Sequence, residues 1–526
     1  MQADAINNAI ASMSRVDRGG IYHNQPLCHA LLNKLDTSVP LQILQSNIHG
    51  TGLFAKEAIP AGADIFISTP FLTVVGDAQQ NTVCDYCYIS SSGMLTTDGR
   101  LRHPPKDPEA EINRCLKCGV CGYCSDHCST MAWVRYHIHE CEALGKTAFV
   151  PVWTRMMYRF LAKDIDHSLL PLEWEALSYL WVYMGGNHPA SGMIGVTAME
   201  VETLMKSGRD DVIRELVLYR IAMNAMPIIT PSEGSHVSVL DFVGSFINHS
   251  CDPNAFLFLE GRTLRMRSLR PINAGEEITR SYMELEEGMV ERREALRDMY
   301  SFVCNCIRCE TEIDDLKDLA IAEDFSLREF YEIRAKFVNF KNEVLSCNNT
   351  IDEMKLQLTI LTDLIFPYRP WPSTVYPMGE MKMVFARLYA NAEKHDQAVI
   401  HALQGCLATT LRYGPNWVRL LHALLNFLKS YLTALIAAGA DSDSSHIVQD
   451  YCIGILNELV VQAKKVFGTN AKYTLAVAKW RNDNFKIVEL PLPGYEGFAE
   501  RFGKAQKKML SWAGIHKRYA VVLSEY

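Results

Sequence analysis

Hydrophobic positions alternate near the start of the chain and later take a helical period. Residues 41–75 alternate apolar and polar positions and carry β-branched residues around glycine turns, so we expect short strands there. The expected turns are at Gly50, Gly52 and Gly62. From residue 150 to 222, apolar residues recur at the helical spacing of about 3.6 positions, which predicts helices.

The later part of the chain adds one hairpin and then becomes helical. The run AFLFLEGRTLRMRSLRP has strand character on both sides of Glu260 and Gly261, which predicts a hairpin there. In residues 310–324 acidic residues outnumber basic ones seven to one, which indicates a solvated linker or the start of a helix. Beyond residue 325 the helical pattern dominates, and it partly matches a tetratricopeptide (TPR) repeat. A plain array of antiparallel helices is the alternative. Six leucines share one helical face: Leu421, Leu424, Leu425, Leu428, Leu432 and Leu435.

Composition and charge exclude several classes of protein. The chain has 526 residues, 48% hydrophobic and 21% charged, which is typical of a globular protein of several domains. Its formal charge of -8 at pH 7 disfavours direct nucleic-acid binding, because such binding needs a basic surface. Polar side chains interrupt the longest apolar stretch, 420–440, so we expect an amphipathic helix and no membrane span. The first twenty residues lack the pattern of a secretory signal, so we expect the cytoplasm or the nucleus.

The 16 cysteines carry the clearest chemistry. A reducing compartment disfavours disulfides, so clustered thiols are candidate metal ligands. Four closely spaced pairs lie between residues 84 and 141, and tetrahedral zinc takes two such pairs, which predicts two zinc ions. The pairs are Cys84 and Cys87, Cys115 and Cys118, Cys124 and Cys128, and His137 and Cys141. Cys121, His127 and His139 are alternative ligands in the same segment.

A third cysteine cluster follows the strand-rich half. Cys304, Cys306 and Cys309 supply three thiols, so a tetrahedral zinc site needs a distant fourth ligand. Cys251, in the polar stretch FINHSCDPN, is the candidate, and a water molecule is the alternative. A zinc ion that joins Cys251 to the triplet would hold this stretch against the later segment.

The motifs together resemble a known family. HGTGLFA, NHSCDPN, GEEITRSY and CNCIRC look like the motifs of a SET domain with its post-SET cysteines, and the four closely spaced pairs look like a MYND-type zinc finger. Followed by a helical region, this layout is similar to that of the SET- and MYND-domain protein lysine methyltransferases. The resemblance implies an α+β fold, in which a SET-domain β-fold is split by a MYND finger and a helical insert and is followed by an all-α, TPR-like C-terminal domain.

The resemblance also implies a division of the chain and a zinc arrangement. In the finger, the first and third pairs would share one zinc ion and the second and fourth pairs another, which gives three zinc ions with the post-SET site. The expected segments are an N-terminal extension (1–40), the first part of the SET domain (41–83), the MYND finger (84–141), the helical insert (142–222), the SET core (223–300), the post-SET zinc segment (301–310) and the helical TPR-like domain (311–526).

The same resemblance assigns roles to particular residues. Tyr282 matches the family's catalytic tyrosine, which orients the amine and the transferring methyl group, and Tyr300 would line the substrate channel with it. A lysine amine must be neutral to accept a methyl group, although its ordinary pKa is about 10.4, and a desolvated aromatic channel lowers that pKa. Expected contacts with S-adenosylmethionine come from Gly50, Thr51, Gly52, Asn224, Asn248, His249, Tyr282 and Phe302.

These assignments leave structural alternatives open. Thr51 departs from the family, which often has asparagine there, so one cofactor contact is in question. Asn224 could instead be the hydrogen-bonded end of a turn, the stretch around Asn248 could be a capped turn, and Tyr282 could be a core residue.

The leading interpretation is a protein-lysine N-methyltransferase. It would transfer a methyl group from S-adenosylmethionine to the ε-amine of a lysine in a histone or non-histone protein. The alternative is a catalytically inactive SET/MYND scaffold that binds protein partners. Peptide partners are expected through the finger and the helical domain, and an acidic enzyme suits a basic substrate peptide.

Overall fold

The computed structural model divides into two compact units, which we describe separately. The first unit takes in Met1–Met283, Arg293–Cys304 and Asn470–Ala476; the second takes in Glu284–Arg292, Asn305–Thr469 and Val477–Tyr526. Apart from a few single positions, the described residues are 20–93, 111–146, 150–165, 169–182, 210–231, 236–312, 335–340, 350–365, 376–408, 414–440, 442–488 and 497–515. Parts of the predicted N-terminal extension, helical insert and acidic linker lie outside them.

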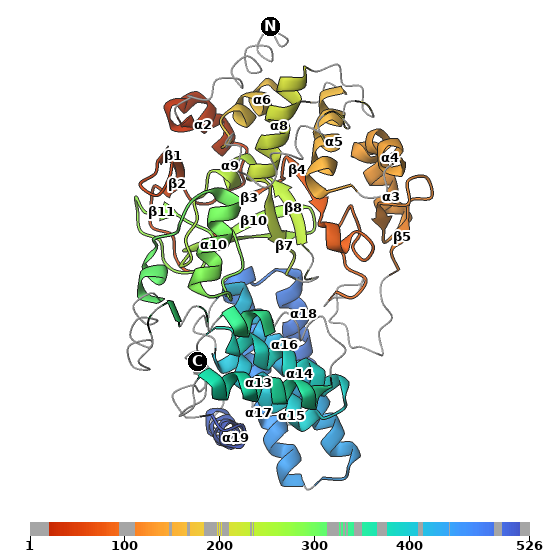
Figure 1. The fold of residues 1–526 in the computed structure, drawn as a ribbon, viewed down its shortest axis with the longest axis vertical. Coiled ribbons are helices and arrows are strands. Elements are labelled where there is room, and N and C mark those ends of the chain that lie inside the picture. The colour runs from red at the N-terminus through yellow and green to blue at the C-terminus, as the bar shows by residue number, and fades with distance from the viewer. Residues whose placement is uncertain are drawn as a thin grey trace. The chain divides into compact units, whose positions relative to one another are not determined.

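Three small antiparallel sheets form the framework of the first unit (Figure 1). Each sheet combines strands that precede the cysteine-rich segment with strands that follow it, so the segment is an insertion into one β-fold. The sheets are β1 (Leu41–Gln45), β2 (Thr51–Ala55) and β11 (Glu277–Ile278); β3 (Asp64–Ser68), β10 (Thr263–Ser268) and β9 (Ala255–Glu260); and β4 (Leu72–Val75), β8 (His236–Leu240) and β7 (Met226–Ile229). Within the insertion, β5 (Asn113–Arg114) pairs with β6 (Gly122–Tyr123).

The predicted strands of residues 41–75 are present, with one correction to the predicted turns. Gly50 and Gly62 have positive φ angles of 51° and 75°, as turn glycines do. Gly52 is not in a turn but inside β2, where a Cβ atom would come within 2.5 Å of Glu277 Oε1. Glycine leaves room there for the Glu277 carboxylate, which a larger residue would force to move.

The predicted hairpin is also present. Strands β9 and β10 pair in register from Glu260 with Thr263 to Ala255 with Ser268, and Gly261 turns the chain with a φ of 58°. Short helices flank the sheets at the start of the chain and before the NHSC stretch. They are η1 (Ile21–His23), α2 (Gln25–Leu32), η2 (Asp77–Gln79) and α9 (Phe242–Ser245).

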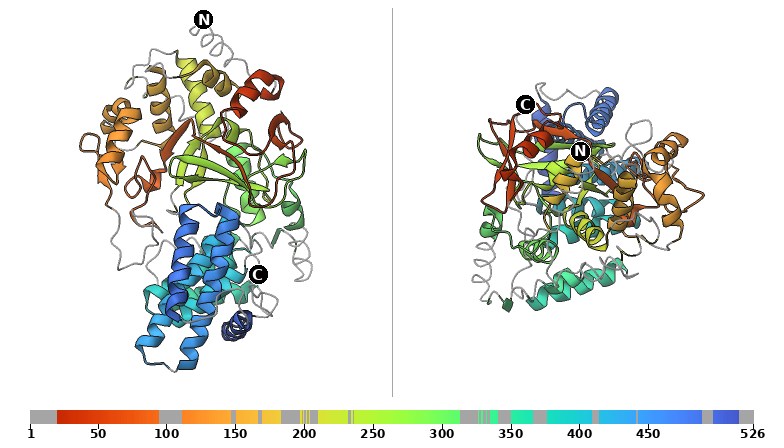
Figure 2. Two further views of the ribbon diagram at one scale, coloured as in Figure 1. Left: turned by 180° about the vertical axis from the view of Figure 1, so that it is seen from behind. Right: turned by 90° about the horizontal axis from the view of Figure 1, so that it is seen from above.

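Helices dominate the insertion, as the apolar spacing from residue 150 to 222 predicts. Both views show α3 and α4 beside α5 and away from the sheet of β1, β2 and β11 (Figures 1 and 2). Helix α5 packs on β4 and on the helices of the cysteine-rich segment. The helices are α3 (Asp126–Ala132), η3 (Trp133–His137), α4 (Ile138–Gly145), α5 (Val152–Ile165), α6 (Pro171–Ser178) and α8 (Asp211–Asn224).

The second unit is helical among its described residues. Consecutive helices α14, α15, α16 and α17 pack on one another, and α17 also packs on α19, which agrees with an array of helices; the match to TPR repeats stays a prediction. The helices are α13 (Ile351–Ile365), α14 (Met378–Asn391), α15 (His395–Ala408), α16 (Gly414–Ala437), α17 (Ser442–Phe467), α18 (Lys472–Val488) and α19 (Phe498–Trp512). Helices α10 (Met289–Tyr300) and α18 cross the boundary between the units.

Helix α16 contains the predicted leucine face. Four of its leucines are buried, whereas Leu432 and Leu435 are half-buried. By length and composition alone α16 could also cross a membrane, with a mean hydropathy of 1.4 over its most apolar window, of which 28% is buried. The buried leucines are Leu421, Leu424, Leu425 and Leu428.

Candidate functional site

The first predicted zinc set lies together in the first unit. The Sγ atoms of Cys84, Cys87, Cys124 and Cys128 are all within 4.8 Å of one another. Cys124 Sγ is 3.5 Å from Cys87 Sγ and 3.6 Å from Cys128 Sγ. A Zn–S bond of about 2.3 Å places tetrahedral sulfur ligands about 3.8 Å apart, so this spacing fits a zinc ion.

The second predicted set is equally compact. The ligand atoms of Cys115, Cys118, His137 and Cys141 lie within 4.8 Å of one another, with 3.8 Å between the thiols of Cys115 and Cys141. His137 Nε2 faces Cys118 Sγ at 3.6 Å, and His137 Nδ1 lies 3.3 Å from Glu140 Oε1. A carboxylate at the far ring nitrogen is the usual partner of a metal-binding histidine, so the donor set fits zinc.

The three alternative ligands lie outside both sets. Cys121 Sγ accepts a hydrogen bond from Arg155 Nη2 at 3.3 Å, which gives this thiol a different partner. Its sulfur also belongs to a smaller group with His137 and Glu140. His127 is exposed, and neither it nor His139 joins a ligand group among the described residues.

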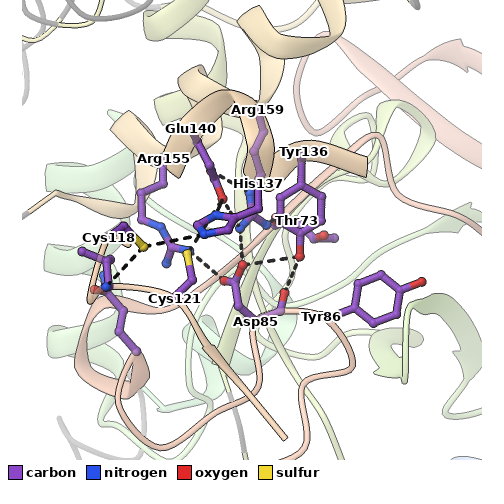
Figure 3. Close-up of polar contacts among 12 residues, drawn as sticks. Thr73, Asp85, Tyr86, Cys118, Cys121, Tyr136, His137, Glu140, Arg155 and Arg159 are labelled. Carbon is purple, nitrogen blue, oxygen red and sulfur yellow. Dashed lines mark hydrogen bonds and ion pairs between the residues drawn. The ribbon is translucent and has the colours of Figure 1, made fainter. Parts of the chain in front are cut away.

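A buried charge network fastens the cysteine-rich segment to α5 (Figure 3). Arg155 Nη2 donates to Asp85 Oδ1 at 2.7 Å, and Arg159 bonds the other oxygen of Asp85. Arg159 also donates to both oxygens of Glu140 at 3.1 Å and bonds the backbone carbonyl of Thr73 in β4. The four charged side chains are at most 4% exposed.

This network balances its charges internally. Burial alone would raise the pKa of the Asp85 carboxyl, but the guanidiniums of Arg159 and Arg155 hold it well below its usual range. The pKa of Glu140 is lowered as well: burial opposes this, while Arg159 is the largest favourable influence. We refer to Asp85, Glu140, Arg155 and Arg159 as the buried charge network.

The third predicted zinc set divides between the two units. Cys251 and Cys304 belong to the first unit, where their Sγ atoms lie within 4.8 Å of each other. Cys306 and Cys309 belong to the second unit and are equally close to each other. Each pair has a spacing that fits zinc, and the four-ligand site stays a prediction.

An aromatic cluster surrounds the predicted catalytic tyrosine. The ring of Tyr282 lies 4.9 Å from that of Tyr300, 6.3 Å from that of Phe302 and 5.3 Å from that of His249, between centroids. Tyr282 Oη donates to the carbonyl of Ile247 at 2.9 Å. Burial raises the pKa of Tyr282 to about 12, so the phenol is protonated at neutral pH and acts as a hydrogen-bond donor.

The NHSC stretch connects this cluster to the glycine loop. Asn248 Nδ2 donates to the carbonyls of His49 and Thr51, both at 3.0 Å, and to Glu277 Oε1 at 2.8 Å. The structure therefore brings the predicted Asn248 beside Gly50, Thr51 and Gly52, although it is nearly 200 residues away in the sequence. The side-chain amide of Asn248 donates its hydrogen bonds to the backbone of the glycine loop, so it fixes the shape of the predicted cofactor site.

His249 is held between the same two regions. Its Nδ1 accepts a hydrogen bond from the backbone N–H of Tyr282 at 3.0 Å, so the ring proton is on Nε2, which faces Cys251 Sγ at 3.2 Å. The ring thus links Tyr282 to a predicted zinc ligand. Any cofactor contact through the backbone of His249 stays a prediction.

Asn224 has a local role at the end of α8. Its Nδ2 donates to the carbonyls of Trp181 at 2.7 Å and Arg220 at 2.8 Å. This is the hydrogen-bonded arrangement that was the alternative for this residue. A direct contact between Asn224 and the cofactor stays a prediction.

Two residues of the site were not among the predicted ones. Glu277 accepts from Asn248 and from Ser46 Oγ, the latter at 2.8 Å, and so closes the glycine loop. Arg280 places its guanidinium carbon 4.2 Å from the centre of the Tyr282 ring, and the residue is only 7% exposed. Both lie in the motif GEEITRSY. For Arg280, a charged residue two positions before the predicted catalytic tyrosine is the signal that the sequence offers.

Comparison with known proteins agrees with this geometry. A family model for the SET domain matches residues 50–283, a range that includes the cysteine-rich insertion. The chain is 28% identical to mouse "Histone-lysine N-methyltransferase SMYD3" over 56% of this chain and 66% of that protein. It is 24% identical to the fission yeast "SET domain and MYND-type zinc finger protein 6", with 50% of each covered. It therefore spans about half to two thirds of these relatives.

Residues 50–283 form a SET domain. With its inserted cysteine-rich segment, the chain is similar to proteins of the SET- and MYND-domain type. Among solved structures, "Structure of Rubisco LSMT bound to AdoMet" is similar at a TM-score of 0.30 and 13% identity, covering 93% of this chain and 94% of that one.

Proposed function

We propose that the chain is an S-adenosylmethionine-dependent protein-lysine N-methyltransferase. The supporting observation is that the NHSC stretch and Tyr282, both distant from the glycine loop in the sequence, lie together with that loop in the structure. The NHSC stretch bonds the glycine loop through Asn248 and the backbone of Tyr282 through His249. A cofactor site and a tyrosine-lined amine site would then adjoin each other. The mouse and fission yeast relatives carry the histone-lysine methyltransferase and SET/MYND names.

The residues of the site divide the work of this reaction. S-adenosylmethionine, when bound, supplies a methyl group on a positively charged sulfur. Asn248, His249 and the glycine loop would hold it, and Phe302 would lie against its adenine. The protonated phenol of Tyr282 would orient the amine and the methyl group in line, while Tyr300 would exclude water.

Zinc would have a structural role in the proposed enzyme. The two four-ligand sets of the cysteine-rich segment fit one ion each, and Cys251, Cys304, Cys306 and Cys309 would hold a third. The ions of the cysteine-rich segment would stabilise the insertion, and the third ion would hold Cys251 close to Nε2 of His249.

The proposed substrate is a lysine in a histone or another protein. The formal charge of -8 favours a basic peptide by electrostatic attraction. The finger and the helical unit would bind further segments of the substrate or of partner proteins.

Two measurements test the proposal. Purified protein is incubated with radiolabelled S-adenosylmethionine and a panel of proteins that includes histones, and S-adenosylhomocysteine binding is measured by calorimetry. We expect transfer of label to protein together with saturable binding. If neither is seen, the chain is a scaffold and the proposal is wrong.

A further inference from the structure

Arg280 is held rigidly beside the predicted catalytic tyrosine. Its backbone N–H donates to the carbonyl of Asn248, and its own carbonyl accepts from the backbone N–H of Ser250, both at 3.0 Å. It lies two positions before Tyr282, and an isolated bridge pairs it with His249. The guanidinium carbon lies 4.2 Å from the centre of the Tyr282 ring.

The charge of Arg280 has no opposite charge beside it in the described part of the chain. Its Nη1 donates to the carbonyl of Ser281 at 3.2 Å, and its Nε is buried without a hydrogen-bond partner. Phenol rings, those of Tyr282 and Tyr300, are the titratable groups that act on it. Burial lowers the pKa of Arg280, but a guanidinium keeps its proton in a folded protein.

The remaining groups around the cluster do not neutralise this charge. Glu277 raises the pKa of Tyr282, but its carboxylate accepts hydrogen bonds from Ser46 and Asn248 rather than from Arg280. His249 accepts the backbone N–H of Tyr282 through Nδ1. An unpaired buried cation is costly for folding, and such a residue is commonly kept for its effect on a ligand.

We propose that Arg280 keeps the protonated, ammonium form of the target lysine out of the aromatic cluster and so selects the neutral amine. This inference rests on the proposed function and adds a selectivity residue to it. A fixed positive charge disfavours a second one nearby, so an ammonium in the cluster would lose its proton more readily. The neutral amine, which carries the lone pair that attacks the methyl group, feels no such repulsion.

The first test is the pH dependence of kcat for the full zinc-loaded chain, since kcat reports ionisations in the enzyme–substrate complex. The acceptor is the protein that is labelled most strongly in the panel. Replacing Arg280 by methionine removes the charge, which raises the pKa of the bound amine. The acidic limb of the profile should therefore move to higher pH by about one unit in Arg280→Met.

Two further variants separate charge from structure. Arg280→Lys keeps the charge and should keep the limb within about 0.3 units of the wild type. Arg280→Gln is a second neutral variant in case methionine prevents folding, and it should behave as Arg280→Met. S-adenosylhomocysteine binding by calorimetry should stay within about twofold of the wild type in all three, since the charge acts on the amine.

A second measurement needs no turnover. With 3-fluorotyrosine at position 282, ¹⁹F NMR follows the ionisation of that phenol, which the charge of Arg280 makes easier. The phenol pKa should rise in Arg280→Met and stay close to the wild-type value in Arg280→Lys. An unchanged phenol pKa in Arg280→Met would overturn the inference.

The outcomes separate this inference from the proposed function. If the wild type methylates protein but the acidic limbs of wild type and Arg280→Met coincide, only the role of Arg280 is wrong. If the wild type methylates nothing, the proposed function is wrong and the role of Arg280 is wrong with it.

Discussion

Three buried arginines in the SET-domain unit have two opposite kinds of surroundings. Arg155 and Arg159 of α5 are bonded to Asp85 and Glu140, and every charge in that network has a partner. Arg280 is buried to a similar degree, yet it faces phenol rings. In the account proposed above, burial of charge has two purposes: it joins the insertion to the SET fold, and it biases the chemistry of a site.

Pairing, rather than burial, distinguishes the two purposes. A paired buried charge costs little when the pair is intact and much when one partner is removed. An unpaired buried charge costs stability from the start, so replacing it with an apolar residue should leave the fold as stable or more stable. Stability measurements can therefore separate a structural arginine from a functional one.

The largest expected effect is on the predicted zinc sites that border the buried charge network. Cys128→Ala removes one ligand of the first set, and structural zinc contributes much of the folding free energy of such modules. We expect elemental analysis to show one zinc ion fewer per chain and the cysteine-rich segment to become sensitive to proteolysis. The matched control Cys452→Ala, a buried cysteine in α17 outside every ligand group of the described residues, should keep the zinc count.

Breaking the buried charge network should have the next largest effect. Arg159→Met leaves Asp85 and Glu140 short of positive charge, which should lower the free energy of unfolding by about 3–5 kcal/mol. Denaturant unfolding of the zinc-loaded protein measures it. The control is Arg297→Met, whose pair with Asp298 is exposed and should contribute less than about 1 kcal/mol. Equal losses of unfolding free energy in Arg159→Met and Arg297→Met would show that the buried ion pairs do not stabilise the fold more than an exposed pair does.

In the proposed catalytic region, Tyr282→Phe should separate an effect on the reaction from an effect on cofactor binding. The variant keeps the aromatic ring and loses the hydroxyl that bonds the carbonyl of Ile247. Misalignment of the amine should lower kcat by about 100-fold, whereas affinity for S-adenosylhomocysteine should change by less than about twofold. Retention of full activity would remove the catalytic role of this hydroxyl.

The smallest expected effect is that of Arg280→Met on stability, and it directly tests the contrast between the paired and the unpaired arginines. Arg280→Met should leave the free energy of unfolding unchanged or raise it by up to about 1 kcal/mol, because it removes a buried charge and leaves no opposite charge unpaired among the described residues; only the carbonyl of Ser281 loses a hydrogen bond. Denaturant unfolding alongside Arg159→Met provides the contrast. A loss as large as that of Arg159→Met would assign Arg280 a structural role instead.

The sequence alone reveals those parts of the molecule that depend on local spacing. The hairpin at Gly261, the helices of the insertion and the two cysteine-rich ligand sets follow from periodicity and from pairs a few residues apart, with the pairing order taken from the family resemblance. Gly52 illustrates the limit, since the side chain that lies against it belongs to Glu277, which is more than 200 residues away.

The buried charge network is harder to predict from the sequence, because it also depends on contacts between distant segments. Arg155 and Arg159 lie one turn apart in the amphipathic stretch WTRMMYRFLA, where arginine is ordinarily expected to face solvent. Their burial depends on Asp85 and Glu140, which other elements bring to the same place. The packing of distant segments, rather than local sequence, decides which side of a helix is buried.

One experiment tests the central claim most directly, namely mass spectrometry of an acceptor protein after incubation with the zinc-loaded chain and S-adenosylmethionine. We predict one or more added methyl groups on a lysine side chain, lost when Tyr282→Phe replaces the wild type. An unmodified acceptor panel, from a chain that contains its zinc and is folded, would contradict the assignment of methyl transfer to this site.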